Sequence, residues 1–280
     1  MPLTSFQPIL SEARKHHFAA GAFNVINMET MQAVVSAGEK SGVPVIAQVY
    51  HSHLDFAGAD FIGTIGRTAA ERSSQPVCIS LDHGRSYGQA KECIECGFTG
   101  VMIDLSADDY GKNVETTKRV VELAHARGVS VEAELGKIFG ADSTGELIRS
   151  GMTDPELAAR FAEDTGVDAL AVSVGTAHGF YAERPQIDFP RLERILQLVK
   201  CPVVVHGGSN TPDEDILEIV RLGVAKINIG TDLMAAFEAG MREALRRGAF
   251  VDIQEALELA RAKVEEVCAD KIRLLTAFQE

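Results

Sequence analysis

The chain has 280 residues, 46% of them hydrophobic and 24% charged, and its formal net charge is -13 at pH 7. This acidic balance argues against a nucleic-acid partner, because binding a phosphate backbone requires clustered Lys and Arg. No stretch reaches the roughly 20 uninterrupted apolar residues of a membrane-spanning helix, and residues 1–17 lack the basic segment and apolar run of a secretory signal.

Short apolar and β-branched runs alternate with longer amphipathic segments, which is typical of strand and helix units around a parallel sheet. The predicted strands span residues 18–26, 43–50, 76–83, 100–106, 129–136, 167–175, 201–208 and 224–230. A helical pattern follows each run, and capping boxes are predicted at 153–156 and 211–214. These units predict an α/β fold, a single (β/α)8 TIM barrel.

Two segments lie outside this repeating pattern. Residues 252–275 have a further helical pattern, which predicts an extra C-terminal helix that packs on a partner subunit or caps the barrel. Residues 136–152 form one long irregular stretch, and loops of this length are often mobile lids. No linker or low-complexity tract divides the chain, so we expect a single domain over residues 1–280.

Histidines are placed at the ends of three predicted strands, where the active site of this barrel forms. They are His83, His178 and His206. Three converging imidazoles suit a catalytic Zn²⁺, which takes three protein ligands and keeps one position open. Ordinary polar contacts are the alternative for each histidine alone, but three together beside glycines favour a metal site. His51 and His53 follow the second strand and are candidates to reach the same place.

Acidic residues collect at the same strand ends. Alternation along the fifth predicted strand places Glu132 and Glu134 on one face, which must be the inner face if either is functional. Asp104 ends the fourth strand. Asp82 precedes His83 and has the opposite strand parity, so it is a general acid or base near the metal or, alternatively, a partner that orients a histidine.

Glycine-rich turns follow the last three predicted strands, in "GTAHG", "HGGSN" and "NIGTD". They offer exposed backbone amides, and Ser209 and Thr231 add hydroxyls where the next helices are expected to begin. Helix N-termini after strands seven and eight are the usual phosphate site of this barrel. The turns therefore predict a phosphate-bearing small substrate.

Together these motifs resemble the class II, metal-dependent ketose-bisphosphate aldolases, in particular the fructose- and tagatose-bisphosphate branch. The similarity covers nearly the whole chain, through "GAFNV", "LDHG", "MIDLS", "VEAELG", "TDPE", "GTAHG", "HGGS" and "NIGTD" in this order. The resemblance implies a zinc-dependent lyase that reversibly cleaves a ketose phosphate into dihydroxyacetone phosphate and an aldehyde.

The resemblance also implies roles for individual residues. The catalytic zinc would be bound by His83, His178 and His206. Asp82 would move the proton of the C4 hydroxyl, while Asp104 and Glu134 would belong to an alternative or second cation position. Asn228 would lie at the enediolate, and a monovalent cation, Na⁺ or K⁺, near the Gly179 backbone. The substrate phosphate would be held by Gly179, Gly207, Gly208, Ser209, Gly230 and Thr231.

Three features depart from the family pattern. Tyr50 replaces a substrate-binding serine after the second strand, and the loop after Glu-Leu-Gly keeps only Gly140, with Asp142 or Glu146 as stand-ins for an acid that assists proton transfer. Gln254 occupies the position of an arginine that binds the distal phosphate of a neighbouring subunit's substrate.

The departures favour a ketose 1-phosphate, or one with a different far end, over a 1,6-bisphosphate. Compensating cations would have to come from Arg149, Lys271 or Arg273.

Other functions stay open at this point. One is a Schiff-base aldolase that uses Lys226 on the eighth strand, another is a sugar-phosphate epimerase with the same enediolate chemistry, and a third is a non-catalytic binding or support subunit. The five cysteines are odd in number and scattered, which favours a reducing cytoplasm over a disulfide framework. We expect no nucleic-acid or membrane partner, and a homodimer or homotetramer.

Overall fold

The computed structural model describes residues 3–181, 183–246 and 252–279. Its strands are β1 (Ala20–Asn24), β2 (Val45–Tyr50), β3 (Val77–Gly84), β4 (Gly100–Ile103), β5 (Ser130–Leu135), β6 (Ala169–Val172), β7 (Val203–Val205) and β8 (Lys226–Ile229). All pairings are parallel and follow chain order, and β8 pairs with β1 to close the barrel. The predicted (β/α)8 barrel is confirmed, and every strand overlaps its predicted range.

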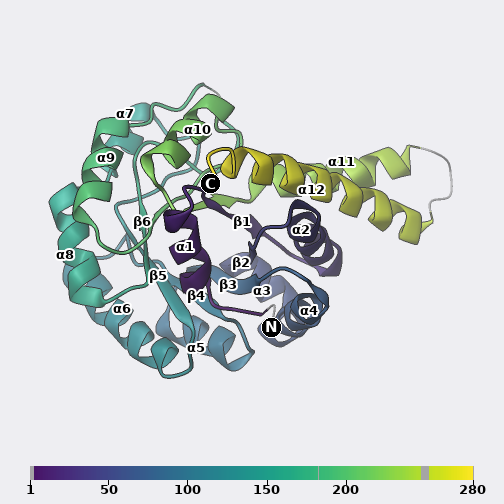
Figure 1. Cartoon of the computed structure of the whole chain (residues 1–280), viewed down its shortest axis with the longest axis horizontal. Coiled ribbons are helices and arrows are strands. Elements are labelled where there is room, and N and C mark those ends of the chain that lie inside the picture. The colour runs from purple at the N-terminus through teal and green to yellow at the C-terminus, as the bar shows by residue number, and fades with distance from the viewer. Residues whose placement is uncertain (1–2, 182, 247–251, 280) are drawn as a thin grey trace.

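Helices surround the barrel. They are α1 (Phe6–Lys15), α2 (Met28–Ser41), α3 (His51–Ala57), α4 (Ala59–Arg72), α5 (Tyr87–Glu95), α6 (Tyr110–His125), α7 (Gly145–Ser150), α8 (Pro155–Thr165), α9 (Phe189–Leu198), α10 (Asp213–Leu222), α11 (Thr231–Leu245) and α12 (Ile253–Leu275). Figure 1 shows α11 and α12 lying side by side and projecting from the barrel; we call this pair the arm. The arm contains the predicted extra C-terminal helix. Within the described ranges, no helix is both long and apolar enough to cross a membrane.

At the N-terminal ends of the strands, the barrel interior is filled with apolar side chains. Small inward side chains, Ala20 and Ala169 among them, pack with Ile46 against Phe6 and Leu10 of α1. In Figure 1, α1 accordingly lies across one end of the barrel. Since this end is closed by apolar residues, polar side chains such as His206, directly after β7, and Asn228, near the end of β8, lie toward the opposite, C-terminal end, where the strands open into loops.

Both predicted capping boxes are wrong. The first helix is capped by Asp154, whereas the Thr153 hydroxyl donates to the Leu135 carbonyl. The second helix, α10, has no side-chain cap, and the Thr211 hydroxyl donates to the Gly207 carbonyl at 2.7 Å. Each threonine therefore ties a strand-end loop to the barrel, because its hydroxyl is closer to a loop carbonyl than to the helix amides.

The predicted irregular stretch over residues 136–152 is more ordered than expected. It includes α7, and its first half pairs with the loop that carries His178. Ala141 N donates to His178 O at 2.7 Å, and His178 N donates to Phe139 O at 2.9 Å. The loop therefore braces a candidate metal ligand, and its motion as a lid stays a prediction.

Candidate active site

A cavity of about 410 Å³ opens at the C-terminal ends of the strands. Most of the predicted site residues line it, namely Asp82, His83, His178, Gly179, Gly207, Ser209, Asn228, Gly230 and Thr231. Asp104, Glu134, His206 and Gly208 do not belong to this lining. Most of the residues that were predicted to form one site at the barrel mouth thus lie around one cavity.

The three histidines converge beside this cavity, which His83 and His178 line and His206 does not. Their ring centroids are 4.7 Å apart for His83 and His206, 5.0 Å for His83 and His178, and 6.0 Å for His178 and His206. One nitrogen from each ring lies within 4.8 Å of the others. His83 and His206 are buried, whereas the His178 side chain is exposed at the mouth. This is the donor set and the open side that a catalytic zinc site requires.

Buried carboxylates fix which nitrogen of each inner histidine faces the centre. His83 Nδ1 lies 2.7 Å from Asp104 Oδ2, and His206 Nε2 lies 2.9 Å from Glu132 Oε1. The remaining nitrogens, His83 Nε2 and His206 Nδ1, face each other at 3.0 Å. When the nitrogens next to the carboxylates carry the ring protons, the two facing nitrogens each have a lone pair. These lone pairs repel each other unless a cation binds between them. Zn²⁺ fits these residues for that reason.

A buried ion pair between Glu132 and Lys226 lies next to His206. Lys226 Nζ, itself 2% exposed, donates to Glu132 Oε2 at 2.7 Å. Burial acts to raise the pKa of the Glu132 carboxyl, but the Lys226 charge and the His206 hydrogen bond prevail and hold this pKa at about 2. Lys226 is therefore committed to an ion pair, which makes it a poor amine nucleophile and disfavours the Schiff-base alternative.

Glu134 is one of the buried groups near the site with an unsatisfied atom. Its Oε2 is buried without a hydrogen-bond partner among the described residues, and it lies 3.8 Å from both His83 Nδ1 and His206 Nδ1. Burial and the nearby charge of Asp104 raise the pKa of Glu134 well above its usual range. With His83 and Asp104, it forms a second cluster that is able to hold a cation, as the resemblance implies.

The end of β3 contains a β-bulge. The strand pairs Leu81 with Val101 and then Gly84 with Ile103, so β3 has one more residue than β4 over this interval. His83 takes up the extra length with a left-handed φ of 49°, a conformation that is uncommon for residues other than glycine and concentrates at functional sites. Because of the bulge, Asp82 and His83 both line the mouth although they are consecutive.

Two amides hold the Asp82 carboxylate. Asn24 Nδ2 donates to one oxygen at 2.7 Å, and Asn228 Nδ2 donates to the other at 3.2 Å. Burial acts to raise the pKa of Asp82, but the charges of His83 and His206 and the Asn24 bond lower it below its ordinary value. The nearest approach of the carboxylate to His83 Nε2 is 3.9 Å, beside the metal position rather than in it.

Asn24 was missed in the sequence analysis. It is the last residue of β1, while Asp82 and Asn228 lie near the ends of β3 and β8, and Gln48 Nε2 donates to its Oδ1 at 3.0 Å, which fixes the amide orientation. A polar residue that closes an apolar strand was the available signal. His51 is buried outside the cavity lining, whereas His53, the other candidate after β2, does line the cavity.

The glycine turns form the opposite wall. Gly207 has φ 73°, and a Cβ at this position would lie 2.4 Å from the Ala177 carbonyl oxygen, so only glycine fits. The Gly208 amide already donates to Asn228 O at 2.9 Å. The contribution of Gly208 to phosphate binding therefore stays a prediction.

The N-terminus of α11 points into this wall, since the helix begins at Thr231 directly after β8. The Ser209 hydroxyl accepts from the amides of Gly230, at 3.1 Å, and Asp232, at 3.2 Å. The expectation that Ser209 stands at the start of its own helix is wrong, because α10 begins only at Asp213. Ser209 instead organises the start of α11, where the helix dipole favours an anion.

None of the predicted compensating cations lines the cavity. Arg149 borders a separate hollow, together with Asp142, and its guanidinium lies 3.5 Å from Gln186 Oε1. Lys271 forms an ion pair with Asp232 at 3.1 Å. Arg273 forms an ion pair with a neighbour on α12. Glu146, like Asp142, is exposed and absent from the cavity lining.

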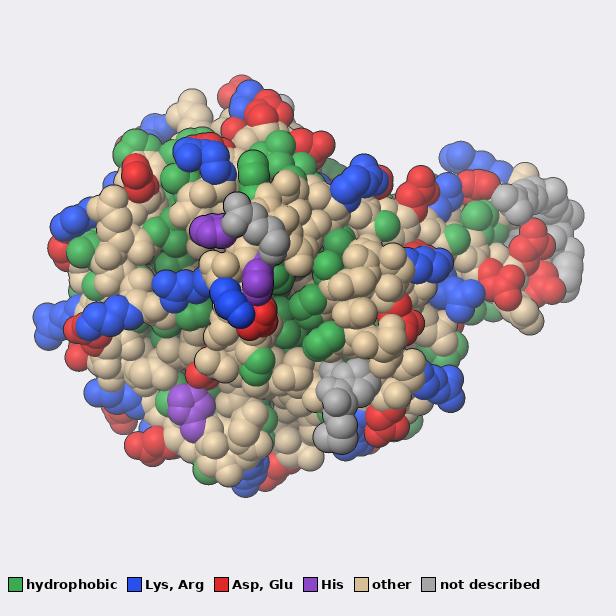
Figure 2. Space-filling model, in the orientation of Figure 1, with side chains coloured by type: hydrophobic (Ala, Val, Ile, Leu, Met, Phe, Trp, Pro, Cys, Tyr) green, Lys and Arg blue, Asp and Glu red, His purple; other side chains and the backbone are tan. Residues whose placement is uncertain are grey.

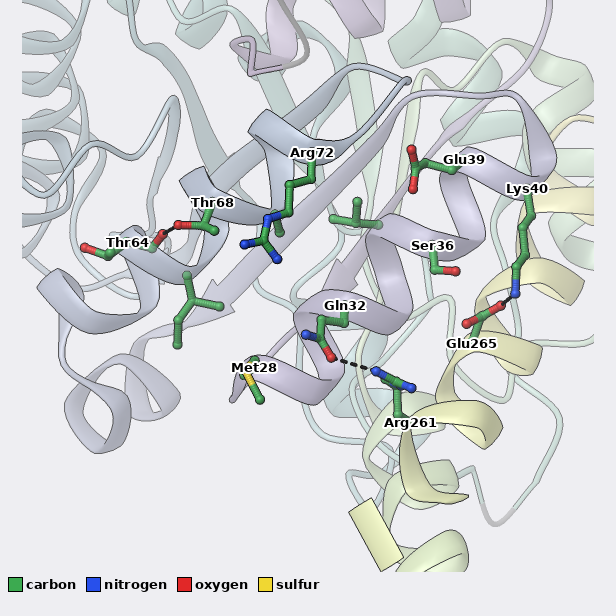
Figure 3. Close-up of a pocket in the computed structure, with 13 residues that line it drawn as sticks. Met28, Gln32, Ser36, Glu39, Lys40, Thr64, Thr68, Arg72, Arg261 and Glu265 are labelled. Carbon is green, nitrogen blue, oxygen red and sulfur yellow. Dashed lines mark hydrogen bonds and ion pairs between the residues drawn. The ribbon is translucent and has the colours of Figure 1, made fainter. Parts of the chain in front are cut away.

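A larger hollow, of about 680 Å³, lies on the outside of the barrel between α2, α4 and α12. Figure 3 shows its side chains, with Arg261 hydrogen-bonded to Gln32 and Lys40 paired with Glu265. Its lining has no histidine or cysteine and is remote from the strand ends. The larger cavity is therefore not the candidate active site. The candidate site is the cavity at the barrel mouth, because its lining includes histidines and an aspartate.

A closed parallel barrel with histidines, carboxylates and glycine turns at its C-terminal mouth defines a TIM-barrel enzyme of small phosphorylated substrates. A family model described as fructose-bisphosphate aldolase class-II matches residues 4–279. The chain therefore belongs to the class II fructose-bisphosphate aldolase family, and it is an aldolase and hence a lyase.

Individual proteins agree with this assignment. A fructose-bisphosphate aldolase of Thermus caldophilus is 40% identical, with 95% of each chain covered. One from Staphylococcus aureus strain Mu50 is 37% identical, covering 98% of this chain and 97% of the other. Among solved structures, the YdjI aldolase of Escherichia coli K12 superposes with a TM-score of 0.88 at 32% identity, covering 98% of this chain and 97% of that chain.

Proposed function

We propose that this chain is a zinc-dependent aldolase that reversibly cleaves a ketose phosphate to dihydroxyacetone phosphate and an aldehyde, with residues 1–280 as one aldolase domain. The single observation that carries the proposal is the pair of facing nitrogens, His83 Nε2 and His206 Nδ1, 3.0 Å apart beside an ionised Asp82. His178 supplies the third ligand from the exposed side. A zinc ion held there would stabilise the negative charge that develops on the substrate oxygens.

Asp82 is the proton acceptor in this proposal. Its carboxylate takes the proton of the substrate's C4 hydroxyl while the bond between C3 and C4 breaks, which leaves an aldehyde at C4. The electron pair of the broken bond becomes the enediolate of the dihydroxyacetone phosphate half, which is released after it takes a proton at C3. The amides of Asn24 and Asn228 hold both carboxylate oxygens, so the group is oriented before substrate arrives. Asn228 also lies 3.1 Å from His206 Nε2, which connects the acid to a metal ligand.

The phosphate of the dihydroxyacetone half would lie against the glycine wall. Gly179, Gly207, Gly230 and Thr231 line that side of the cavity, and the N-terminus of α11 adds a favourable dipole. Ser209 keeps its hydroxyl proton available, because its oxygen accepts from two amides of this helix start. A monovalent cation, Na⁺ or K⁺, near the Gly179 backbone remains part of the proposal, as does a second cation position at Asp104 and Glu134.

The substrate is proposed to be a ketose 1-phosphate or one without a 6-phosphate. Gln254 lies at the start of α12, far along the arm, where it is exposed and bonds only to Glu258 and the Asp252 cap among the described residues. The neutral side-chain amide of Gln254 cannot form the charge-assisted, bidentate hydrogen bonds that an arginine makes with a phosphate. The preference for a bisphosphate should therefore stay below about a hundredfold.

We also propose a homodimer or homotetramer in the cytoplasm. The arm projects from the barrel and leaves Leu245 58% exposed and Ile253 64% exposed, apolar surface that a second subunit would cover. Figure 2 shows charged side chains of both signs along the arm, the mixture found at the rim of an interface.

An assay against a panel of ketose phosphates tests the proposed function. The purified protein is treated with chelator, and dihydroxyacetone phosphate release is followed by a coupled enzyme before and after Zn²⁺ is restored. We expect activity only with metal, and cleavage of at least one ketose 1-phosphate. Full activity in excess chelator would exclude the zinc site, and interconversion of ketoses without dihydroxyacetone phosphate would mean an epimerase.

A further inference from the structure

We propose that Tyr181 is a positioning residue whose phenol fixes the turn of residues 177–181 and, with it, the zinc ligand His178. The inference rests on the proposed function, because it concerns how the third ligand of the zinc site is held in place. Tyr181 itself does not line the cavity at the barrel mouth, so it would act through the backbone rather than on the substrate.

The His178 ring lacks the support that the other two histidines have. Asp104 lies 2.7 Å from a nitrogen of the His83 ring, and Glu132 lies 2.9 Å from one of the His206 ring. Within the described ranges, the His178 side chain forms no hydrogen bond or ion pair, and it is exposed. The position of this ring is therefore set by the backbone that carries it.

That backbone is held from two sides. The loop after β5 holds the ligand itself, since His178 N donates to Phe139 O at 2.9 Å and His178 O accepts from Ala141 N at 2.7 Å. Tyr181 holds the preceding residue, because its phenol oxygen accepts from Ala177 N at 2.7 Å and its hydroxyl donates to Ala177 O at 3.0 Å. All four polar backbone atoms of Ala177 and His178 are thus paired, two of them by one phenol.

The same phenol also contacts the loop that follows β7. Its hydroxyl lies 3.4 Å from the carbonyl oxygen of Gly207, the residue after the zinc ligand His206. The two loops touch at this point, because a Cβ on Gly207 would lie 2.4 Å from Ala177 O. Tyr181 therefore lies where the loop that carries His178 meets the loop that carries His206.

The phenol is able to hold this turn because it keeps its proton. Burial raises the pKa of Tyr181 above its usual range, although hydrogen bonds with Thr211 and Ala177 act to lower it. The hydroxyl is therefore both a donor and an acceptor at neutral pH. Its removal would leave the amide of Ala177, a fully buried residue, without this partner, and an unpaired buried amide favours rearrangement of the turn.

The test removes only the hydroxyl, in Tyr181→Phe. Zinc affinity is measured by competition with a chromogenic chelator, and we expect it to fall by about tenfold to a hundredfold, the usual effect of losing a group that orients a metal ligand. The melting temperature of the zinc-free protein should fall by only about 2–4 °C, as expected for the loss of one hydrogen bond.

Tyr110→Phe is the matched control. The Tyr110 hydroxyl also takes part in a hydrogen bond, to Asp164 at 3.1 Å, but it belongs to α6 and is not part of the cavity lining. This variant loses a hydroxyl of the same kind, so it should show a similar change in melting temperature. Its zinc affinity should equal that of the wild type.

Turnover at saturating zinc gives a second readout, measured as condensation of dihydroxyacetone phosphate with glyceraldehyde. Gly179 lies inside the same turn and lines the phosphate side of the cavity. We therefore expect Tyr181→Phe to raise the KM for dihydroxyacetone phosphate by about threefold to tenfold, with kcat nearly unchanged because Asp82 and the zinc are in place. A variant that is only less stable would instead lower kcat and keep KM.

Unchanged zinc affinity in Tyr181→Phe, or an equal loss of affinity in Tyr110→Phe, would overturn the positioning role and leave the zinc site of the wild type standing. A lower kcat with unchanged KM would likewise overturn it, since Tyr181 would then serve stability alone. Absence of zinc binding by the wild type would overturn the proposed function, and this inference with it.

Discussion

The ion pair of Lys226 and Glu132 gives the sharpest test of how the site is held in place. Both side chains are almost fully buried, 2% and 1% exposed, and their charged atoms are 2.7 Å apart. We predict that Lys226→Met destabilises the protein, because it leaves the Glu132 carboxylate in the core without its cation. Removal of one partner from a buried pair costs about 3–5 kcal/mol.

The pKa of Glu132 leads to a similar magnitude. Its environment lowers this pKa from 4.5 to about 2. A tenfold change in an acid constant corresponds to about 1.4 kcal/mol, so the native surroundings favour the ionised carboxylate by about 3 kcal/mol over water. Part of this free energy comes from His206, which remains in the variant. We therefore expect the loss on removing Lys226 to lie near the lower end of the range of about 3–5 kcal/mol.

The sign of the pH dependence changes in the variant. In the wild type the folded pKa is depressed, so the stabilisation is present above the unfolded pKa and is lost only as the pH falls through about 2. In Lys226→Met, burial should raise the folded pKa of Glu132 above its unfolded value. The variant should therefore lose stability as the pH rises between these two values.

Urea unfolding followed by circular dichroism between pH 5 and 8, with and without Zn²⁺, measures these effects. The double variant Lys226→Met, Glu132→Gln removes both charges and keeps an acceptor for His206, and it should recover at least about 2 kcal/mol of the loss. A single variant that loses less than about 1 kcal/mol, or a double variant no more stable than the single, would refute this account.

Three further outcomes are expected. Asp82→Ala should keep bound zinc but lose about 10² to 10⁴ in kcat, the usual scale for a positioned acid or base, and near-normal turnover would assign proton transfer elsewhere. His206→Ala should purify without stoichiometric zinc by metal analysis, and unchanged zinc content would remove His206 from the ligand set. Gln254→Arg should raise the ratio of kcat/KM for 1,6-bisphosphates over 1-phosphates by about tenfold or more, and an unchanged ratio would separate Gln254 from the substrate.

Strand positions could be predicted because each strand is a short, mostly apolar run that is buried in the barrel. The same rule located the candidate site, since a His, Asp or Asn that closes such a run must lie at the mouth. Asn24 obeys this rule as well as Asp82 does, and its bond to Asp82 joins ends of strands that are 58 positions apart in the chain.

Features that depend on three-dimensional distance could not be predicted in this way. Thr153 and Thr211 have the sequence of helix caps, but their hydroxyls donate instead to the carbonyls of Leu135, at the end of β5, and Gly207, in the loop after β7. The bulge at His83 is also invisible in the sequence, because it exists only relative to the register of β4.

That bulge has a mechanical consequence. If the proton carrier and the metal ligand came from separate segments, flexing of the scaffold would change the spacing between them. Here Asp82 and His83 are consecutive, and their Cα atoms are joined by one trans peptide, a link of about 3.8 Å that does not stretch. When the barrel flexes, these two Cα atoms therefore keep their separation, and the amides of Asn24 and Asn228 hold the Asp82 carboxylate beside the metal position.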